Sequence, residues 1–376
     1  MKYQSYKFLV LFLVMGMGLY ACSKKSGNKN TQGEAAQGGQ TAMSSGTTMI
    51  NGAGSTFIYP MFSKWTDEYH KMHPDIEFNY QAIGSGGGIR QLLNGTVEIG
   101  ASDAPLNDEQ MAAAEKAHGP VIHLPDAMGA VTVSYNVPGV KGVLKFSGPV
   151  LADIFLGKIK KWNDPRIKAL NPGVNLPDNQ IIVVHRSDGS GDTYIFVDYL
   201  CKVSKEWNSN VGRGTSVQWP VGLGAKGNQG VAADIQRTPN SIGYITLIYA
   251  LQNNIAFGSV KNKAGYFIHP TIQSVTAAAA NAATDVPNDL RFSITDPPGK
   301  TSYPIASATW LIVYVNQTNK EAGEKTVKFL HWVLTDGQKM ESKLDYAPIP
   351  KAIQKKELNL LKKVNYNGQS LLTMNN

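Results

Sequence analysis

Residues 181–203 read IIVVHRSDGSGDTYIFVDYLCKV, and this one stretch contains a strand, a turn and a helix in that order. The β-branched run 181–184 is typical of a buried strand, and the apolar residues of 192–203 recur at helical spacing. The turn between them is rich in glycine and serine, which allow a tight chain reversal. A strand that ends in such a turn and opens a helix is the repeating unit of α/β folds.

The same unit occurs twice more, nearer the N-terminus. The turn 52–56, GAGST, joins a strand at 48–50 to a helix predicted over 58–72, and the turn 84–88, GSGGG, joins a strand at 76–80 to a helix predicted over 89–94. Other segments follow the same alternation: we predict strands at 97–102, 131–137, 241–250 and 308–315, a helix after the Asn-x-x-Gln cap at 107–110, and a helix over 319–342 followed by an extended tail. The chain is therefore predicted to be an α/β protein.

These glycine-rich turns are candidate anion sites. Each presents free backbone N–H groups at the positive end of a helix dipole, and the hydroxyls of Thr56, Ser85 and Ser190 add further donors. Ligands of open α/β sheets bind at the carboxyl ends of the strands, where all three turns are expected. One such turn alone is typical of any helix start, but three of them indicate a shared oxyanion site.

A charged cluster belongs to the same turns. Arg186 can bind a tetrahedral oxyanion through two N–H groups, and Asp188, two residues later, is placed to orient it. Asp103, in GASDAP, would repel an anion unless the ligand donates a proton to it. Phosphate carries a proton near neutral pH and sulfate does not, so this carboxylate favours phosphate. Asp103 as a simple turn residue before Pro105 is the alternative.

Seven motifs carry a resemblance to a known family. They are GAGSTF (52–57), AIGSGGGIRQL (82–92), GASDAPL (100–106), LADIFLGKIKKWND (151–164), HRSDGSGDT (185–193), WPVGLGAKGNQGVA (219–232) and SIGYI (241–245). In this order, over nearly all of 48–350, they resemble the phosphate-binding protein (PstS type) of the phosphate-specific ABC transporter. The resemblance implies a type II periplasmic-binding-protein fold, with two α/β domains, a two-segment hinge and a ligand cleft between the domains. It implies a discontinuous first domain, 48–131 plus 305–376, and a second domain, 132–304.

The resemblance also implies a ligand set for inorganic phosphate. Carried over motif by motif, the phosphate-binding residues are Thr56, the backbone N–H of Phe57, Ser85, Asp103, Arg186, Ser190, Gly191 and Asp192, with Asp188 orienting Arg186. Some members have threonine where this chain has Asp192. We expect the Asp192 side chain to contact the ligand, which would favour H₂PO₄⁻ because a second carboxylate requires a second donated proton. The alternative is that only the N–H of Asp192 contacts the ligand.

The N-terminus is predicted to be a secretion signal and a membrane tether. Basic residues precede a short apolar run, too short to span a bilayer, and Leu-Tyr-Ala-Cys follows at 19–22. This resembles a lipobox, so we predict a signal peptide over 1–21, an acylated (palmitate-bearing) Cys22 and a flexible tether over 22–47. An ordinary secretory cleavage is the alternative. The protein is then extracytoplasmic and anchored to a bacterial membrane. Cys201 is left unpaired and is predicted to be a buried core residue.

Charge and motifs exclude several other functions. Without the charges of 1–47, the formal +8 falls to 31 basic against 27 acidic residues, and no nucleic-acid-binding motif is present. No G-x-S-x-G elbow supports a hydrolase, and no histidine pair completes a metal site. No G-K-[ST] occurs, so the ATPase of the importer is a separate subunit. We therefore expect a monomeric binding protein, not an enzyme, without cofactor or metal, that delivers phosphate to the permease. A binding protein for another oxyanion, or a phosphate sensor or adhesin on the same fold, stays open.

Overall fold

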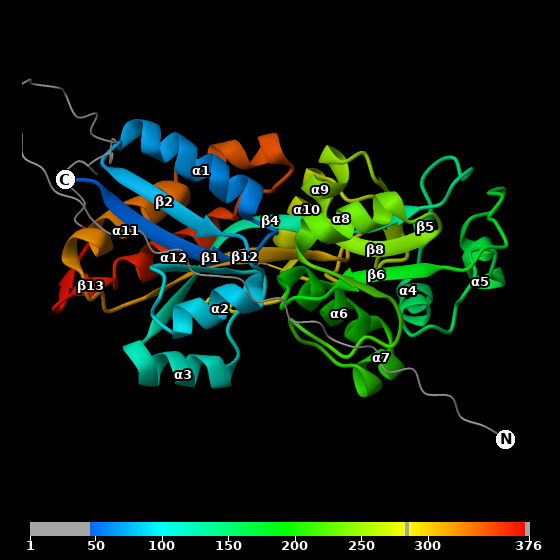
Figure 1. The fold of residues 1–376 in the computed structure, drawn as a ribbon, viewed down its shortest axis with the longest axis horizontal. Helices are drawn as coiled ribbons and strands as arrows, with labels where there is room; N and C mark the ends of the chain where they lie inside the picture. Colours follow the sequence, from blue (N-terminus) through cyan, green and yellow to red (C-terminus); the bar gives the residue numbers. More distant parts are fainter. Residues whose placement is uncertain (1–45, 283–285, 373–376) are drawn as a thin grey trace, which may run out of the picture. The chain divides into compact units, whose positions relative to one another are not determined.

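The computed structural model describes residues 46–282 and 286–372 (Figure 1). The described residues belong to one compact unit. The predicted signal peptide, Cys22 and all but the last two residues of the predicted tether lie outside the described residues. Within those residues, no helix is both long and apolar enough to cross a membrane.

One large mixed sheet organises the chain. Its strands have the order β2-β1-β3-β12-β4-β8-β6-β7, and β9 pairs with β4. Their bounds are β1 Thr48–Gly54, β2 Ile76–Gln81, β3 Ile99–Ser102, β4 Val121–Asn136, β6 Ile182–Arg186, β7 Leu223–Ala225, β8 Ser241–Thr246, β9 Ala256–Phe257 and β12 Ala306–Tyr314. Smaller sheets consist of β5 Lys145–Phe146, β10 Ser259–Lys261 and β11 Phe267–Ile268, and of β13 Asn365–Tyr366 and β14 Gln369–Ser370.

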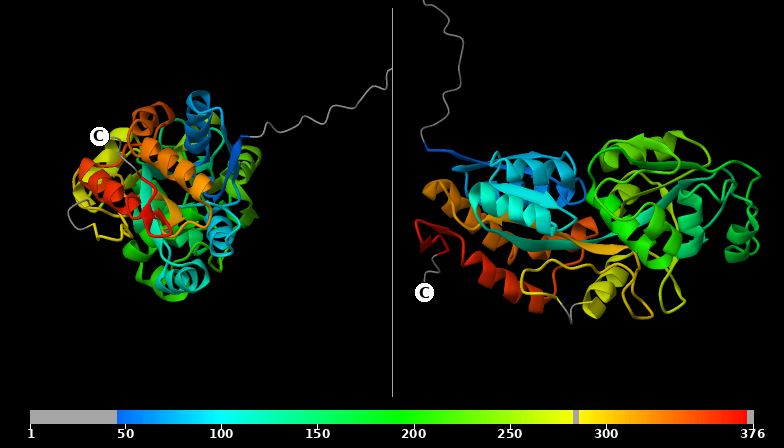
Figure 2. Two further views of the ribbon diagram at one scale, coloured as in Figure 1. Left: turned by 90° about the vertical axis from the view of Figure 1, so that its left-hand side faces the viewer. Right: turned by 90° about the horizontal axis from the view of Figure 1, so that it is seen from below.

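The sheet has two halves that share strand β4. Residues 121–130 of β4 pair antiparallel with β12, whereas 131–136 pair antiparallel with β8. We call β2, β1, β3 and β12 the first half-sheet and β8, β6 and β7 the second half-sheet. Figures 1 and 2 show β4 and β12 running together from one group of helices and strands toward the other. The change of pairing falls beside the expected domain boundaries at 131 and 305; that the halves are separate domains stays a prediction.

Helices cover both half-sheets. α1 (Tyr59–Met72) starts three residues after the turn 52–56, whereas α2 (Ser85–Leu93) and α6 (Gly191–Val203) start within the turns 84–88 and 188–191 (Figure 1). The other helices are α3 Asp108–His118, α4 Gly148–Phe155, α5 Pro165–Leu170, α7 Lys205–Asn210, α8 Gly227–Arg237, α9 Leu247–Gln252, α10 Ile272–Ala282, α11 Lys320–Val333, the 3₁₀ helix η2 Gly337–Leu344 and α12 Lys351–Leu361. The predicted Asn-x-x-Gln cap of α3 is confirmed, because Asn107 and Gln110 form a reciprocal capping box.

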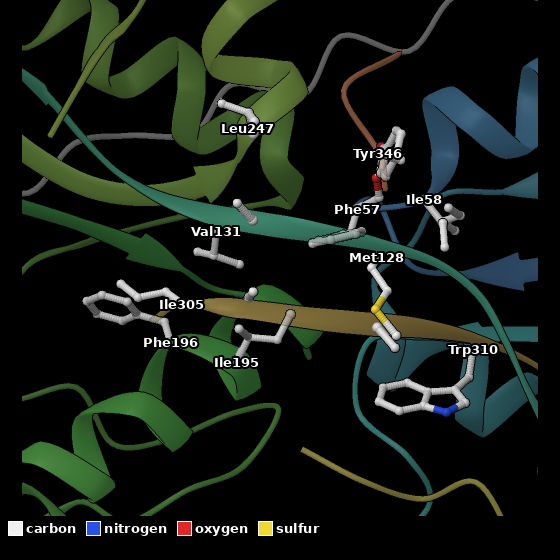
Figure 3. Close-up of a cluster of buried hydrophobic side chains, with 14 of the residues drawn as sticks. Phe57, Ile58, Met128, Val131, Ile195, Phe196, Leu247, Ile305, Trp310 and Tyr346 are labelled. Atoms are coloured by element: carbon white, nitrogen blue, oxygen red, sulfur yellow. Dashed lines mark hydrogen bonds between the residues drawn. The ribbon is translucent and has the colours of Figure 1, made fainter. Parts of the chain in front are cut away.

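Apolar side chains pack on both faces of β4 and β12. In Figure 3, Phe57, Met128 and Tyr346 lie along these strands toward the first half-sheet, and Val131 and Ile305 lie further toward the second. All of them are buried, and the rings of Phe57 and Tyr346 are 5.9 Å apart. Cys201 is also buried, as predicted. The two strands are therefore held in a continuous core, which fixes the positions of the turns at their sides.

Three sequence predictions of secondary structure are wrong. The single helix predicted over 319–342 is interrupted, because α11 ends at Val333 and the 3₁₀ helix η2 begins at Gly337. The strand predicted over 241–250 ends at Thr246, and Leu247 begins α9, because an apolar run does not distinguish one long strand from a strand followed by a buried helix. The segment after 342 is not an extended tail, because Pro350 is the N-cap residue of helix α12. Proline is compatible with a helix start, where its missing N–H costs nothing.

Candidate functional site

The turns 84–88 and 188–191 are in direct contact. The Gly86 N–H donates to the Gly189 carbonyl oxygen at 2.9 Å. Gly84 has φ 83°, which favours glycine, and a Cβ atom at this position would lie 2.3 Å from Oδ2 of Asp188. The starts of α2 and α6 therefore meet, although they follow strands of different half-sheets.

Asp103, directly after β3, joins all three turns. The Ser55 hydroxyl donates to its Oδ1 at 2.5 Å, and the Ser85 hydroxyl donates to its Oδ2 at 3.2 Å. On its other side lies Gly191, where an added Cβ atom would be 2.2 Å from Oδ2 of Asp103. The predicted grouping of Ser85, Asp103 and Gly191 is thus present, with Ser55 as an additional member.

Burial sets the proton affinity of Asp103. Its side chain is 1% exposed, and this burial, followed by the negative charge of Asp192, raises its pKa to about 7, although hydroxyl hydrogen bonds from residues such as Ser55 oppose the shift. A carboxyl group with such a pKa can accept or donate a proton near neutral pH. Asp103 therefore has the property that recognition of a protonated anion requires.

Arg186, the last residue of β6, is buried and held by two carboxylates. Its Nε and Nη2 donate to Oδ1 and Oδ2 of Asp188 at 2.7 and 2.6 Å, and its Nη1 donates to Oδ2 of Asp192 at 2.9 Å. Burial raises the pKa of Asp188, but the hydrogen bonds and charge of Arg186 outweigh it and hold that pKa below its ordinary value. A guanidinium has five N–H groups. Within residues 46–282 and 286–372, one N–H on each terminal nitrogen has no protein acceptor.

The carboxylate of Asp192 is occupied by protein donors. Arg186 and the Asn228 Nδ2 donate to its Oδ2, the latter at 2.7 Å, and the Thr246 hydroxyl donates to its Oδ1 at 2.6 Å. Burial raises the pKa of Asp192, and Arg186 opposes this shift. This arrangement argues against the expected contact between the Asp192 side chain and a ligand, because three protein donors already surround the carboxylate. The alternative, a contact through its N–H, is the better supported prediction.

The backbone N–H groups of four buried residues at the candidate site have no protein acceptor among the described residues, as is usual for the first N–H groups of a helix. They belong to Thr56, Ser85, Gly191 and Asp192, at the starts of the three helices. A buried N–H without a partner costs free energy, so nearly all such groups in proteins are paired. Together with the two available N–H groups of Arg186, they provide six hydrogen-bond donors, a set that suits an oxyanion with several oxygen atoms.

Two predicted residues lie at the site with different contacts from those expected. The N–H of Phe57 donates to the Ser55 hydroxyl at 2.9 Å, and its ring packs against Gly129 of β4. The Ser190 hydroxyl caps α6 by accepting from the Thr193 N–H at 3.1 Å, which leaves the hydroxyl hydrogen to be donated. Direct ligand contacts of Phe57 and Ser190 stay predictions.

Sequence reasoning missed several residues of this site. Ser55 lies within the quoted turn 52–56, but Thr56 alone was assigned a role there. Asn228, Thr246 and Tyr249 are all buried, and Asn228 and Tyr249 contact Thr56 directly. Asn228 lies in the quoted motif WPVGLGAKGNQGVA, where its type and spacing gave no sign that it contacts residue 56.

No catalytic pair is formed by the histidine next to Arg186. The ring of His185 stacks on Trp219 at a centroid distance of 4.8 Å, and its Nδ1 is 3.0 Å from the Arg186 carbonyl oxygen. The half-buried ring of His185 thus packs against Trp219. Among the described residues, no group of three or more His, Cys, Asp or Glu side chains has the geometry to hold a metal ion.

Comparison with known proteins gives concordant matches. A model described as the PBP superfamily domain matches residues 30–337. The phosphate-binding protein PstS of Pasteurella multocida is 43% identical over 316 residues, 84% of this chain and 90% of that protein. The protein of the same name from Xylella fastidiosa strain 9a5c is 42% identical over 91% of this chain and 94% of its own length. A crystal structure of a phosphate-binding protein from Stenotrophomonas maltophilia superposes with a TM-score of 0.64 at 17% identity, covering 82% of this chain and 92% of that one.

Proposed function

We propose, from the premise that this chain belongs to the PBP superfamily, that it binds inorganic phosphate and delivers it to an ABC-type phosphate importer. Relatives named phosphate-binding protein PstS, at 42–43% identity over most of both chains, support this function. The observation that carries it is that the buried Asp103 contacts Ser55, Ser85 and Gly191, at the same helix starts where backbone N–H groups have no protein acceptor among the described residues.

The donor set suits a tetrahedral oxyanion. Backbone N–H groups of Thr56, Ser85, Gly191 and Asp192 approach from three helix N-termini, where the helix dipoles favour negative charge. Arg186 adds a fixed positive charge that Asp188 orients. Hydrogen bonds to a charged partner contribute about 1.5–3 kcal/mol each, so a set of this size is sufficient for tight binding.

Asp103 provides the discrimination between anions. Its carboxylate would repel sulfate, which has no proton to donate, whereas phosphate can share a proton with it. Because the pKa of Asp103 is raised to about 7, mainly by burial, the shared proton can reside on either partner. We propose that this residue selects phosphate and that Asp192 contributes its N–H rather than its carboxylate.

The location and partners form part of the proposal. Lys2, Lys7, the apolar run before Cys22 and the polar segment that follows favour export, acylation of Cys22 and a tether. We propose an extracytoplasmic, monomeric, non-catalytic lipoprotein that docks on a permease whose ATPase is a separate chain. Cys22→Ala should release the protein from the membrane fraction. Equal membrane retention of the variant and the wild type would contradict lipid anchoring.

Calorimetric titration tests the binding function directly. The protein without residues 1–45, which retains all described elements, is titrated with phosphate and with sulfate at pH 7. We expect a dissociation constant for phosphate of about 1 μM or lower, which corresponds to roughly 8 kcal/mol, and at least a hundredfold weaker sulfate binding. Comparable affinities for the two anions would contradict the proposed selectivity, and no heat with phosphate would contradict the function.

A further inference from the structure

We propose that Asn228 is a positioning residue that fastens the two half-sheets together and turns the Thr56 hydroxyl into a hydrogen-bond donor for the ligand. The inference rests on the proposed phosphate-binding function, and it assigns a role to a residue that makes no predicted contact with phosphate. Asn228 is the second residue of α8 and is fully buried.

The orientation of the Asn228 amide is fixed by its neighbours. The Thr246 N–H donates to Oδ1 at 2.9 Å, so this atom must be the oxygen. The two hydrogens of Nδ2 then go to Oδ2 of Asp192 at 2.7 Å and to Oγ1 of Thr56 at 3.0 Å. All polar atoms of this side chain are used, and the alternative amide orientation would place oxygen against the Asp192 carboxylate.

This arrangement determines what Thr56 can do. A threonine hydroxyl has one hydrogen to donate, and its oxygen can accept from others. Because the oxygen of Thr56 accepts from Asn228, its hydrogen is left to be donated elsewhere. Thr56 follows β1 and precedes α1, at one of the three helix starts that form the candidate site. Its hydroxyl is thereby prepared to donate to an oxyanion.

A second contact secures the same residue. The Tyr249 hydroxyl of α9 donates to the Thr56 carbonyl oxygen at 2.7 Å. Thr56 belongs to the first half-sheet, whereas Asn228 and Tyr249 belong to helices that pack on the second half-sheet. Both bonds connect protein groups only. They therefore favour the arrangement in which the two half-sheets meet at the candidate site, even when no ligand is bound. Asn228 and Tyr249 thus act as a latch on Thr56.

Replacement of Asn228 by aspartate tests this role through the pH dependence of phosphate binding, which a purely structural residue would not change. Ionised aspartate would place a second carboxylate against Asp192 and leave Thr56 only the longer bond from the backbone N–H of residue 228, at 3.4 Å. Protonated aspartate can restore one of the two side-chain bonds. Other charged or titratable groups near position 228 also affect this test. They are Asp192, Arg186, Asp188 (which accepts from the Gly227 N–H), Tyr249 and Lys226. Protonation should therefore partly rescue the variant.

Phosphate binding by wild type, Asn228→Asp, Asn228→Ala and Asn208→Asp is measured by calorimetry at pH 5.5 and pH 8, with dissociation followed by stopped-flow fluorescence. Asn208→Asp adds the same charge at an exposed position of α7 and serves as the matched control. We expect Asn228→Ala to bind roughly 10–100-fold more weakly, mostly through faster dissociation. For Asn228→Asp, the ratio of its dissociation constant to that of the wild type should fall at least about fivefold from pH 8 to pH 5.5. The control should match the wild type at both pH values.

The outcomes separate this inference from the proposed function. If the wild type binds phosphate and both Asn228 variants bind within twofold of it, the latch is contradicted. If the wild type binds no phosphate, the proposed function itself fails. Should the Asn228 variants not fold, Tyr249→Phe removes one latch bond and keeps the ring. We expect this variant to bind severalfold more weakly with an unchanged phosphate-to-sulfate ratio, and unaltered affinity and dissociation rate would overturn the latch.

Discussion

The Cα atom of Gly191 packs against the carboxyl group of Asp103. A Cβ atom at position 191 would lie 2.2 Å from Oδ2 and 2.4 Å from Cβ of Asp103, well inside any normal contact. Gly191 is the first residue of α6 and Asp103 follows β3, so this contact joins the second half-sheet to the first. Glycine is required here for close approach and not for a special backbone angle.

Gly191→Ala should therefore weaken phosphate binding without unfolding the protein. The methyl group forces the two half-sheets apart at the site, at a cost of about 1–3 kcal/mol, or roughly 5–150-fold in affinity. Calorimetry and thermal unfolding would measure both effects. Gly230→Ala, within α8, is the control, because the added Cβ atom would lie at an ordinary 3.5 Å from the Cβ atom of Ala225 in β7. The control should keep the affinity and gain about 0.5–1 kcal/mol of stability. Equal affinities of all three proteins would contradict the role of this contact.

Asp103→Asn should narrow the preference for phosphate over sulfate. The amide removes the negative charge that repels sulfate, and it replaces the charged acceptor of the phosphate proton by a neutral amide that cannot take up this proton. We expect phosphate affinity to fall and sulfate affinity to rise, so that the ratio drops by roughly tenfold or more, about the effect of one charge-assisted hydrogen bond. Competition calorimetry measures the ratio. A ratio equal to that of the wild type would mean that Asp103 is merely a turn residue.

Asp188→Asn should weaken phosphate binding because it removes a carboxylate that orients the Arg186 guanidinium. Asp188 accepts from two nitrogens of the guanidinium and from the Gly227 N–H at 3.0 Å. An amide cannot accept both bonds from the guanidinium, so Arg186 loses its orientation, and phosphate binding should weaken by roughly 10–100-fold. Asp234→Asn breaks an exposed aspartate–arginine pair on α8 and should have no effect on binding. If both variants bind like the wild type, Asp188 does not orient Arg186.

The sequence was sufficient for the elements with local signatures. The turn 188–191 and its helix follow from glycine, serine and helical spacing within one short segment, and α6 begins one residue before the predicted start. Asn107 and Gln110 cap α3 as predicted, because a capping box involves residues only three apart. Such features depend on neighbours in the sequence and need no knowledge of the tertiary structure.

The missed features depend on residues far apart in the sequence. Asn228 contacts Thr56 from 172 residues away, and the Asp192 carboxylate meets its partner Thr246 from 54 residues away. Sequence reasoning identified Asp192 as a site residue but could not show that protein donors already surround its carboxylate. The contacts of a buried polar side chain are set by how helices pack on the sheet, which residue type and spacing do not specify.

A second group of buried carboxyl groups lies away from the candidate site. Asp126 of β4 and Glu357 of α12 are both fully buried. Within the described part of the chain, none of their carboxylate oxygens has a hydrogen-bond partner. Burial, followed by the charge of Asp126, raises the pKa of Glu357 well above its ordinary value. The folded protein therefore holds a proton on Glu357 that the unfolded chain releases above its ordinary pKa.

Glu357→Gln should accordingly change how stability depends on pH. With the folded-state pKa raised, the contribution of Glu357 to stability is present at pH values below the unfolded pKa, near 4.5, and declines as pH rises above it. Glutamine has no proton to lose, so the variant should gain on the wild type with increasing pH, by up to about 1.4 kcal/mol per pH unit. Urea unfolding at pH 5, 7 and 9 measures this difference. Glu115→Gln, at an exposed position of α3, is the control and should follow the wild type at all three pH values. A difference between Glu357→Gln and the wild type that stays constant from pH 5 to pH 9 would show that Glu357 does not take up a proton on folding.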